Sequence, residues 1–94
     1  MAVSISKFLL NTARQTLFEG VPIYSLNLER KDRDRIERVG YMLRYAEKHP
    51  DTDVFTSFKQ LAAGRYDSAM EEWHAAKKDM VLYEALVKLK ATTQ

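Results

Sequence analysis

Residues 66–89, YDSAMEEWHAAKKDMVLYEALVKL, contain neither glycine nor proline. A segment of this length without a helix breaker predicts one long helix from about Tyr66 to Leu89, or two helices joined near residues 77–80. Its second half has two apolar seams at helical spacing, which are Met80, Tyr83 and Val87, and Leu82, Leu86 and Leu89. Because a helix with two apolar stripes needs two neighbours, the segment indicates a helical bundle.

Glycine and proline divide the first two thirds of the chain into shorter elements. The amphipathic spacing of residues 4–20 predicts a helix that Gly20 and Pro22 end. Residues 21–26, VPIYSL, have β-branched and aromatic character. We therefore expect a short extended segment there, packed across the helices rather than paired in a sheet.

Two further helices are expected before the long segment. The first runs from about Leu28 to His49, because Pro50 disfavours helical backbone in the residue before it. The second is short and ends at Gly64. The fold class predicted for residues 1–94 is therefore all-α, a single domain built as a compact bundle of about four helices.

The composition fits a small domain with one modest core. The chain has 94 residues, of which 46% are apolar and 30% charged, with no cysteine and a net charge of +2. Without cysteine it cannot form disulfides or thiolate metal sites, and a cytoplasmic address is the default. Its longest apolar run is residues 80–83, too short for a membrane span, so no membrane partner is expected.

The two ends of the chain carry their own expectations. Residues 1–18 contain Lys7 and Arg14 but no acid, the bias of a transit peptide, although their apolar spacing is that of an ordinary core helix. Disorder is expected only in residues 1–4 and 91–94.

A dense run of charges lies in the second expected helix. Residues 29–38, ERKDRDRIER, hold four acids and five bases, and the bases are Arg30, Lys31, Arg33, Arg35 and Arg38. These bases form the candidate site for nucleic acid, as in a small nucleic-acid-associated regulator. Acids four residues away are expected to neutralise them, in the pairs Glu29–Arg33, Arg30–Asp34 and Asp34–Arg38. Since phosphate binding depends on uncompensated positive charge, we do not expect nucleic acid as the main partner.

Residues 64–77 resemble the second half of a tetratricopeptide repeat. The positions that carry the resemblance are Gly64, Tyr66, Ala69, Trp73 and Ala76. It implies a tight helical hairpin in which small residues let two helices approach, Trp73 fills the groove beside them, and a ligand is bound on the surface. We therefore expect Trp73 to be the core anchor of the last hairpin.

The same stretch is also similar to a helix-turn-helix, through Gly64, Met70 and Trp73. That resemblance implies a recognition helix that enters a DNA groove. The exposed side of this helix would present Glu71 and Glu72, however, and carboxylates near phosphates weaken binding. A nucleic-acid-associated regulator of helix-turn-helix type is therefore kept as the alternative function.

Catalytic and metal-binding patterns are sparse. The motif EEWH, residues 71–74, is half of a di-iron pattern, which needs a second copy on another helix. The chain lacks a glycine-rich phosphate loop and a nucleophile elbow. We therefore expect no enzyme activity, no catalytic or metal-ligating residue and no cofactor.

A protein partner is the remaining expectation. The chain is predicted to be a small non-catalytic protein-binding module, an adaptor or an inhibitor of a larger protein, and self-association through its C-terminal helix is compatible with this. The predicted partner-binding residues are Leu82, Leu86, Leu89 and Tyr83. The reason is that the domain has few helices to cover a second apolar stripe, and an exposed apolar patch usually marks an interface.

Overall fold

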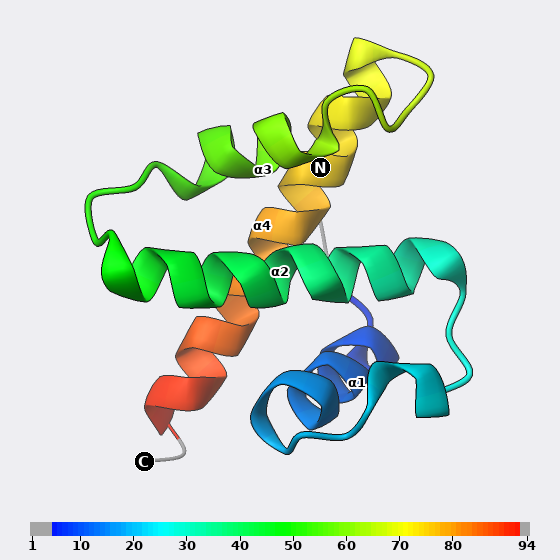
Figure 1. Cartoon of the computed structure of the whole chain (residues 1–94), viewed down its shortest axis with the longest axis vertical. Coiled ribbons are helices and arrows are strands. Elements are labelled where there is room, and N and C mark those ends of the chain that lie inside the picture. Colours follow the sequence, from blue (N-terminus) through cyan, green and yellow to red (C-terminus); the bar gives the residue numbers. More distant parts are fainter. Residues whose placement is uncertain (1–4, 93–94) are drawn as a thin grey trace.

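Four α-helices and one turn of 3-10 helix make up residues 5–92, the part of the chain described by the computed structural model (Figure 1). They are α1 (Lys7–Phe18), η1 (Ile23–Ser25), α2 (Arg30–Lys48), α3 (Val54–Ala62) and α4 (Ala69–Thr92). No strand occurs within this range, so the predicted all-α bundle of four helices is confirmed. The disorder expected for residues 1–4 and 93–94 lies outside the described residues, whereas Ala91 and Thr92 belong to α4.

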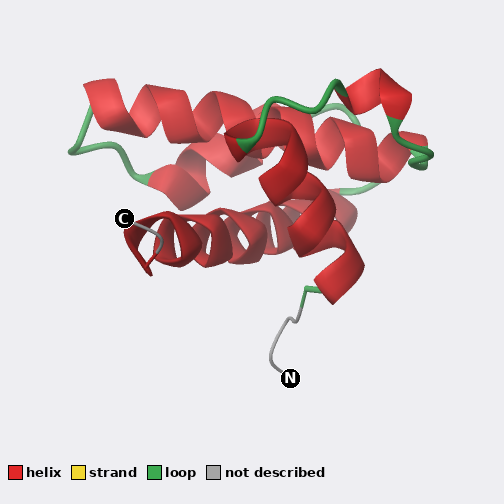
Figure 2. Ribbon diagram, turned by 90° about the horizontal axis from the view of Figure 1, so that it is seen from below, coloured by secondary structure: helices red, strands yellow, loops and turns green. Residues whose placement is uncertain are grey.

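The long segment forms one helix, and that helix organises the fold. With 24 residues, α4 is about 36 Å long, close to the 37 Å length of the molecule. It packs against α1, α2 and α3. In Figure 2, α2 and α3 lie above α4 and α1 crosses beside it, so one side of α4 is left facing away from the other helices.

The core lies where α4 meets the other three helices. Its fully or nearly fully buried apolar residues include Leu9 and Ala13 of α1, Ile36, Val39 and Met42 of α2, Phe58 of α3, and Leu82 and Leu86 of α4. Leu82 and Leu86 have no exposed surface, and the prediction that they form a partner-binding stripe is therefore wrong. They are buried because α1, α2 and α3 pack against α4, and both leucines belong to the core cluster that these helices form.

The helix ends follow from particular residues. Ser6 caps α1, since its hydroxyl accepts a hydrogen bond from the Leu9 N–H at 3.1 Å. The Asp53 carboxylate accepts from the Thr56 N–H and hydroxyl at the start of α3. After α3, Gly64 has a φ of 75°, a backbone conformation that glycine adopts without strain.

The segment expected to be extended contains a helical turn. Ile23–Ser25 form η1, in which the Ser25 N–H donates to the Pro22 carbonyl at 3.0 Å, while Pro22 and Leu26 on either side are extended. The prediction of an extended segment is thus wrong at its centre. The physical reason is local, because the φ of −60° imposed on Pro22 begins a tight turn as readily as a strand.

The helices that the structure describes include none that is long and apolar enough to cross a membrane.

Candidate functional site

Apolar side chains occupy the solvent side of α4 as well as its core side. Met70 is 66% exposed, Trp73 is 42% exposed and Val87 is 41% exposed. Trp73 and Val87 are fourteen residues apart, close to four helical turns, so both lie on the same side of α4. We call Met70, Trp73, Lys77, Met80, Glu84, Val87, Lys88 and Ala91 the outward face of α4.

The position of Trp73 corrects one prediction. Its ring was expected to anchor the core, yet it lies at the surface because Ala75 and Ala76 take the buried positions in this part of α4. The Trp73 ring stands edge-on to Phe55 of α3, with 6.5 Å between the ring centroids and 88° between the planes. The ammonium of Lys77 lies 4.9 Å from the Trp73 ring centroid. The indole is thus held in place while one side of it stays open to solvent.

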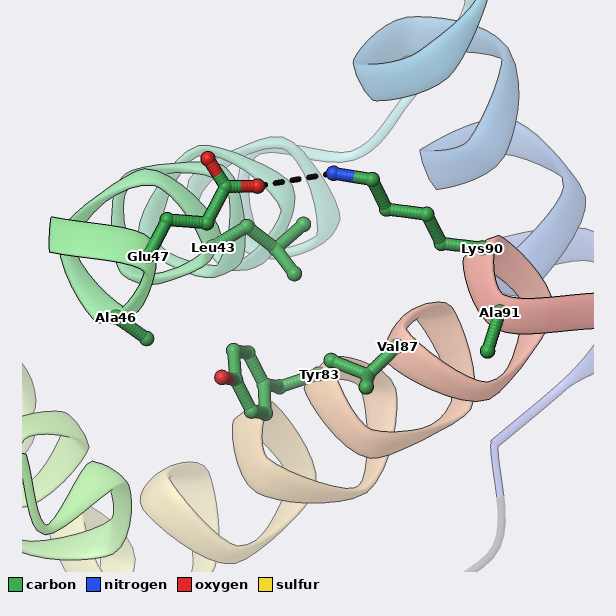
Figure 3. A pocket seen from close by; sticks show the side chains of 7 residues that line it. All are labelled: Leu43, Ala46, Glu47, Tyr83, Val87, Lys90 and Ala91. Atoms are coloured by element: carbon green, nitrogen blue, oxygen red, sulfur yellow. Dashed lines mark hydrogen bonds and ion pairs between the residues drawn. The ribbon is translucent and has the colours of Figure 1, made fainter. Parts of the chain in front are cut away.

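A groove of about 350 Å³ lies between α2 and α4, near the C-terminal ends of both helices (Figure 3). Its walls are Leu43, Ala46 and Glu47 of α2, and Tyr83, Val87, Lys90 and Ala91 of α4. The Lys90 ammonium donates to the Glu47 carboxylate at 2.9 Å across the groove. The groove therefore has an apolar lining and one ion pair at its rim, a shape that suits an apolar side chain.

Two groups in the groove have shifted pKa values. The hydrogen bond from Lys90 and its positive charge lower the pKa of the Glu47 carboxyl, so Glu47 is ionised at neutral pH. Burial raises the pKa of the Tyr83 hydroxyl, and the negative charge of Glu47 adds to that effect. Tyr83 is the predicted partner-binding residue that does line this groove, whereas Leu89 is half-buried and is not part of the groove wall.

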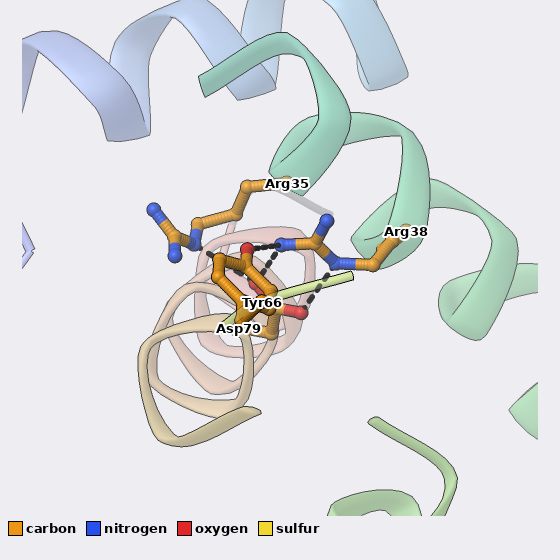
Figure 4. A network of polar contacts seen from close by, with 4 residues as sticks. All are labelled: Arg35, Arg38, Tyr66 and Asp79. Carbon is orange, nitrogen blue, oxygen red and sulfur yellow. Dashed lines mark hydrogen bonds and ion pairs between the residues drawn. The ribbon is translucent and has the colours of Figure 1, made fainter. Parts of the chain in front are cut away.

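A buried polar network joins α2 to α4 at the opposite end of the interface (Figure 4). Asp79 of α4 is fully buried. Its carboxylate accepts hydrogen bonds from Arg35 Nε at 2.8 Å, from Arg38 Nε at 2.7 Å and from Arg38 Nη2 at 3.0 Å. The Tyr66 hydroxyl lies 3.5 Å from Arg38 Nη2. Asp79 was not among the predicted site residues, although its spacing from Leu82 and Leu86 places it on the core side of the helix.

The network changes the charge of the candidate nucleic-acid site. Burial lowers the pKa of the Arg38 guanidinium, but the hydrogen bonds and negative charge of Asp79 outweigh it and raise that pKa above its ordinary value. The expected pair Asp34–Arg38 is therefore wrong, because Arg38 points inward to Asp79. Arg35 makes the second ion pair with Asp79. The two guanidinium groups share one carboxylate, so one of their two positive charges is compensated, and both side chains are largely buried.

The other three bases lie further toward the start of α2. Arg30 is within 3.9 Å of Asp34, as predicted, but both side chains are well exposed. The Arg33 guanidinium lies 5.1 Å from the ring centroid of Tyr24. Lys31 is exposed. These bases are not gathered into one uncompensated positive stripe.

Glu71 and Glu72, which the helix-turn-helix resemblance would place on the recognition helix, lie in the first turn of α4. The Gly64 N–H donates to the Glu72 carboxylate at 3.4 Å, and the Asp67 N–H donates to the Glu71 carboxylate at 3.2 Å. These carboxylates hold the loop before α4. The His74 ring lies against Trp73, and within residues 5–92 no group of three His, Asp or Glu side chains is placed to hold a metal ion.

Comparison with known proteins finds no family model that matches the chain, no curated protein that matches it in sequence and no solved structure that matches it in fold. The resemblances of residues 64–77 to a tetratricopeptide repeat and to a helix-turn-helix stay predictions that rest on those residues alone.

Proposed function

We propose that the chain is a small non-catalytic protein-binding module, an adaptor or an inhibitor of a larger protein, and that the outward face of α4 is its contact surface. The observation that carries the proposal is the exposure of Met70, Trp73 and Val87 on a helix whose opposite side forms the core. Met70 and Trp73 lie one helical turn apart and form the apolar part of this face, and tryptophan and methionine are enriched in interfaces.

Trp73 is the anchor residue of the proposed interface. Tryptophan is among the side chains that contribute most to binding when a partner covers them. The contacts with Phe55 and Lys77 hold its ring in one orientation, so little side-chain freedom is lost on binding. The groove beside Val87 offers a second point of attachment for an apolar side chain of the partner.

The nucleic-acid alternative is supported less well. Its five bases include Arg35 and Arg38, whose side chains are largely buried and share the single carboxylate of Asp79. Its recognition helix would present Glu71 and Glu72 in the first turn. Nucleic-acid affinity comes from bases that displace counterions, and a compensated base displaces few.

Site-directed photocrosslinking tests the proposed surface. A photoreactive phenylalanine derivative replaces Trp73 in one version of the chain and Tyr24 in a control, since Tyr24 is a 76% exposed aromatic in η1. Both versions are produced in the native host. A partner of the outward face of α4 is crosslinked from position 73 and not from position 24.

The captured protein is then purified and titrated with the unmodified chain and two variants. Trp73→Ala is expected to weaken binding about 30-fold, the effect of losing an interface anchor worth about 2 kcal/mol. Tyr24→Ala is expected to leave the affinity within about twofold. Equal crosslinking from both positions, or full affinity of Trp73→Ala, would contradict the proposed surface.

A further inference from the structure

Two opposite charges on the outward face of α4, Lys77 and Glu84, are not paired with each other in the monomer. Lys77 and Glu84 lie on the same side of the helix, seven residues and about 10 Å apart along its axis, too far for an ion pair with each other. Glu84 is exposed and has no ion-pair partner in the described part of the chain. Lys77 lies over the rings of Trp73 and Phe55.

We propose that the outward face of α4 binds a second copy of this chain, with the two α4 helices antiparallel about a twofold axis between Met80 and Val81. The proposal rests on the proposed function and names its partner. In a twofold pair each contact occurs twice, since the same surface serves both copies. Lys77 then lies opposite the partner's Glu84, and Glu84 lies opposite the partner's Lys77.

The same pairing matches the remaining side chains of the face. Trp73 comes opposite the partner's Lys88, with the partner's Val87 beside it, so the open side of the indole receives a cation and an apolar group. Met70 comes opposite the partner's Ala91, a large residue against a small one. Met80 comes opposite the partner's Val81, next to the twofold axis. Lys77 and Glu84 thus form the unlike charge pairs, Met70 makes an apolar contact, and Lys88 makes a cation–aromatic contact with Trp73.

The charge pattern also selects the direction of the pair. A parallel arrangement in register would place Lys77 against the partner's Lys77 and Glu84 against the partner's Glu84. Like charges that face each other across helices destabilise the pair. The order of Lys77 and Glu84 about the centre of α4 is therefore self-complementary only for antiparallel helices.

The size of the face sets the strength of the dimer. A strip along α4 is about 36 Å long and about 10 Å wide, a few hundred square ångströms for each copy. Stable interfaces bury about 1,200–2,000 Å² in total, so this strip, counted over both copies, falls below that range and the dimer is expected to be weak. The dissociation constant is expected in the range of about 10–500 µM, with dimer formation dependent on concentration.

Charge reversal tests the proposal directly. Sedimentation equilibrium of the full chain at about 5–1,000 µM compares the natural sequence with Lys77→Glu, Glu84→Lys and the double variant. Each single reversal replaces two attractive contacts by two repulsive ones and is expected to weaken dimerisation at least tenfold. The double variant restores both contacts, and its dimerisation is expected within about threefold of the natural chain.

Two controls accompany these measurements. Glu37→Lys reverses an exposed charge on α2 and is expected to leave dimerisation unchanged. Circular dichroism and thermal melting confirm that each variant is folded, which is expected because Glu84 is exposed and Lys77 is half-exposed.

Three outcomes would overturn the proposal: a natural chain that stays monomeric at every concentration, single reversals that dimerise normally, or a double variant that does not recover. The proposed function is judged separately by the crosslinks from position 73. A different protein captured there would keep the outward face of α4 as a binding surface and remove the second copy as its occupant. Monomeric behaviour without any crosslinked partner would remove both.

Discussion

Replacement of Asp79 by alanine is expected to destabilise the fold by about 3–5 kcal/mol, the cost of breaking a buried ion pair by removing one partner. The variant removes the carboxylate that accepts from Arg35 and Arg38 at 2.8 and 2.7 Å. Their side chains are only 12% and 7% exposed, so the two guanidinium groups would lose their acceptor in a place that water reaches poorly. For a chain of 94 residues the whole free energy of unfolding is about 5–14 kcal/mol.

Urea denaturation followed by circular dichroism measures the effect. With a slope of about 1–3 kcal/mol per molar urea, the Asp79→Ala midpoint is expected at least about 1 M below that of the natural chain. Asp34→Ala is the matched control, because it removes an exposed carboxylate 3.9 Å from Arg30. That control is expected to change the free energy of unfolding by less than about 0.5 kcal/mol.

A triple variant distinguishes the contribution of the ion pair itself from the cost of leaving two buried guanidinium groups without an acceptor. In Arg35→Met, Arg38→Met, Asp79→Leu, no charge is left without a partner, so most of the stability lost in Asp79→Ala is expected to return. If Asp79→Ala unfolds within about 1 kcal/mol of the natural chain, or if the triple variant loses the sum of the single effects, the assignment of Asp79 as a buried ionic clamp is wrong.

Three further outcomes follow from burial and charge. Leu86→Lys is expected to unfold the domain because an ammonium without a partner would enter the core, whereas Val87→Lys should keep nearly the same thermal midpoint; equal melting of the two would contradict the burial pattern of α4. Trp73→Ala is expected to lower the free energy of unfolding, measured by urea denaturation, by less than about 1.5 kcal/mol, and a decrease of about 3 kcal/mol or more would show that Trp73 is a core residue. Hydrogen bonds from the Thr56 hydroxyl and N–H lower the pKa of Asp53, so its ionised form favours the folded state. The stability difference between the natural chain and Asp53→Ala is therefore expected to be full at neutral pH and to shrink as the pH falls below about 4, and urea denaturation at several pH values measures it.

The helices could be predicted because their ends depend on local chemistry. Gly20, Pro50 and Gly64 interrupt the helical pattern where they stand, and the absence of such residues after Tyr66 left one long helix. The groove beside Tyr83 was not predicted, although an apolar arc too wide for the domain was expected on this helix.

Which side of α4 faces the core could not be predicted from apolar residues, because both sides carry them. The stripe with Leu82 and Leu86 was assigned to solvent, and Trp73 was assigned to the core, and both assignments were wrong. Large apolar residues are not always buried, so the size of an indole is a weak guide to its position. The informative residue was Asp79, whose place among the leucines pointed to a buried base on another helix.

The buried carboxylate thus sets the rotation of α4 about its own axis. A helix with Leu82 and Leu86 on one side and Trp73 and Val87 on the other has large apolar residues on both sides, so these residues alone do not fix which side is buried. Only one rotation brings Asp79 to Arg35 and Arg38, and a turn of half a revolution would leave all three charges without partners. In Asp79→Leu the chain is therefore expected to sample two packings of the same helix, visible as doubled or broadened amide resonances in place of one set.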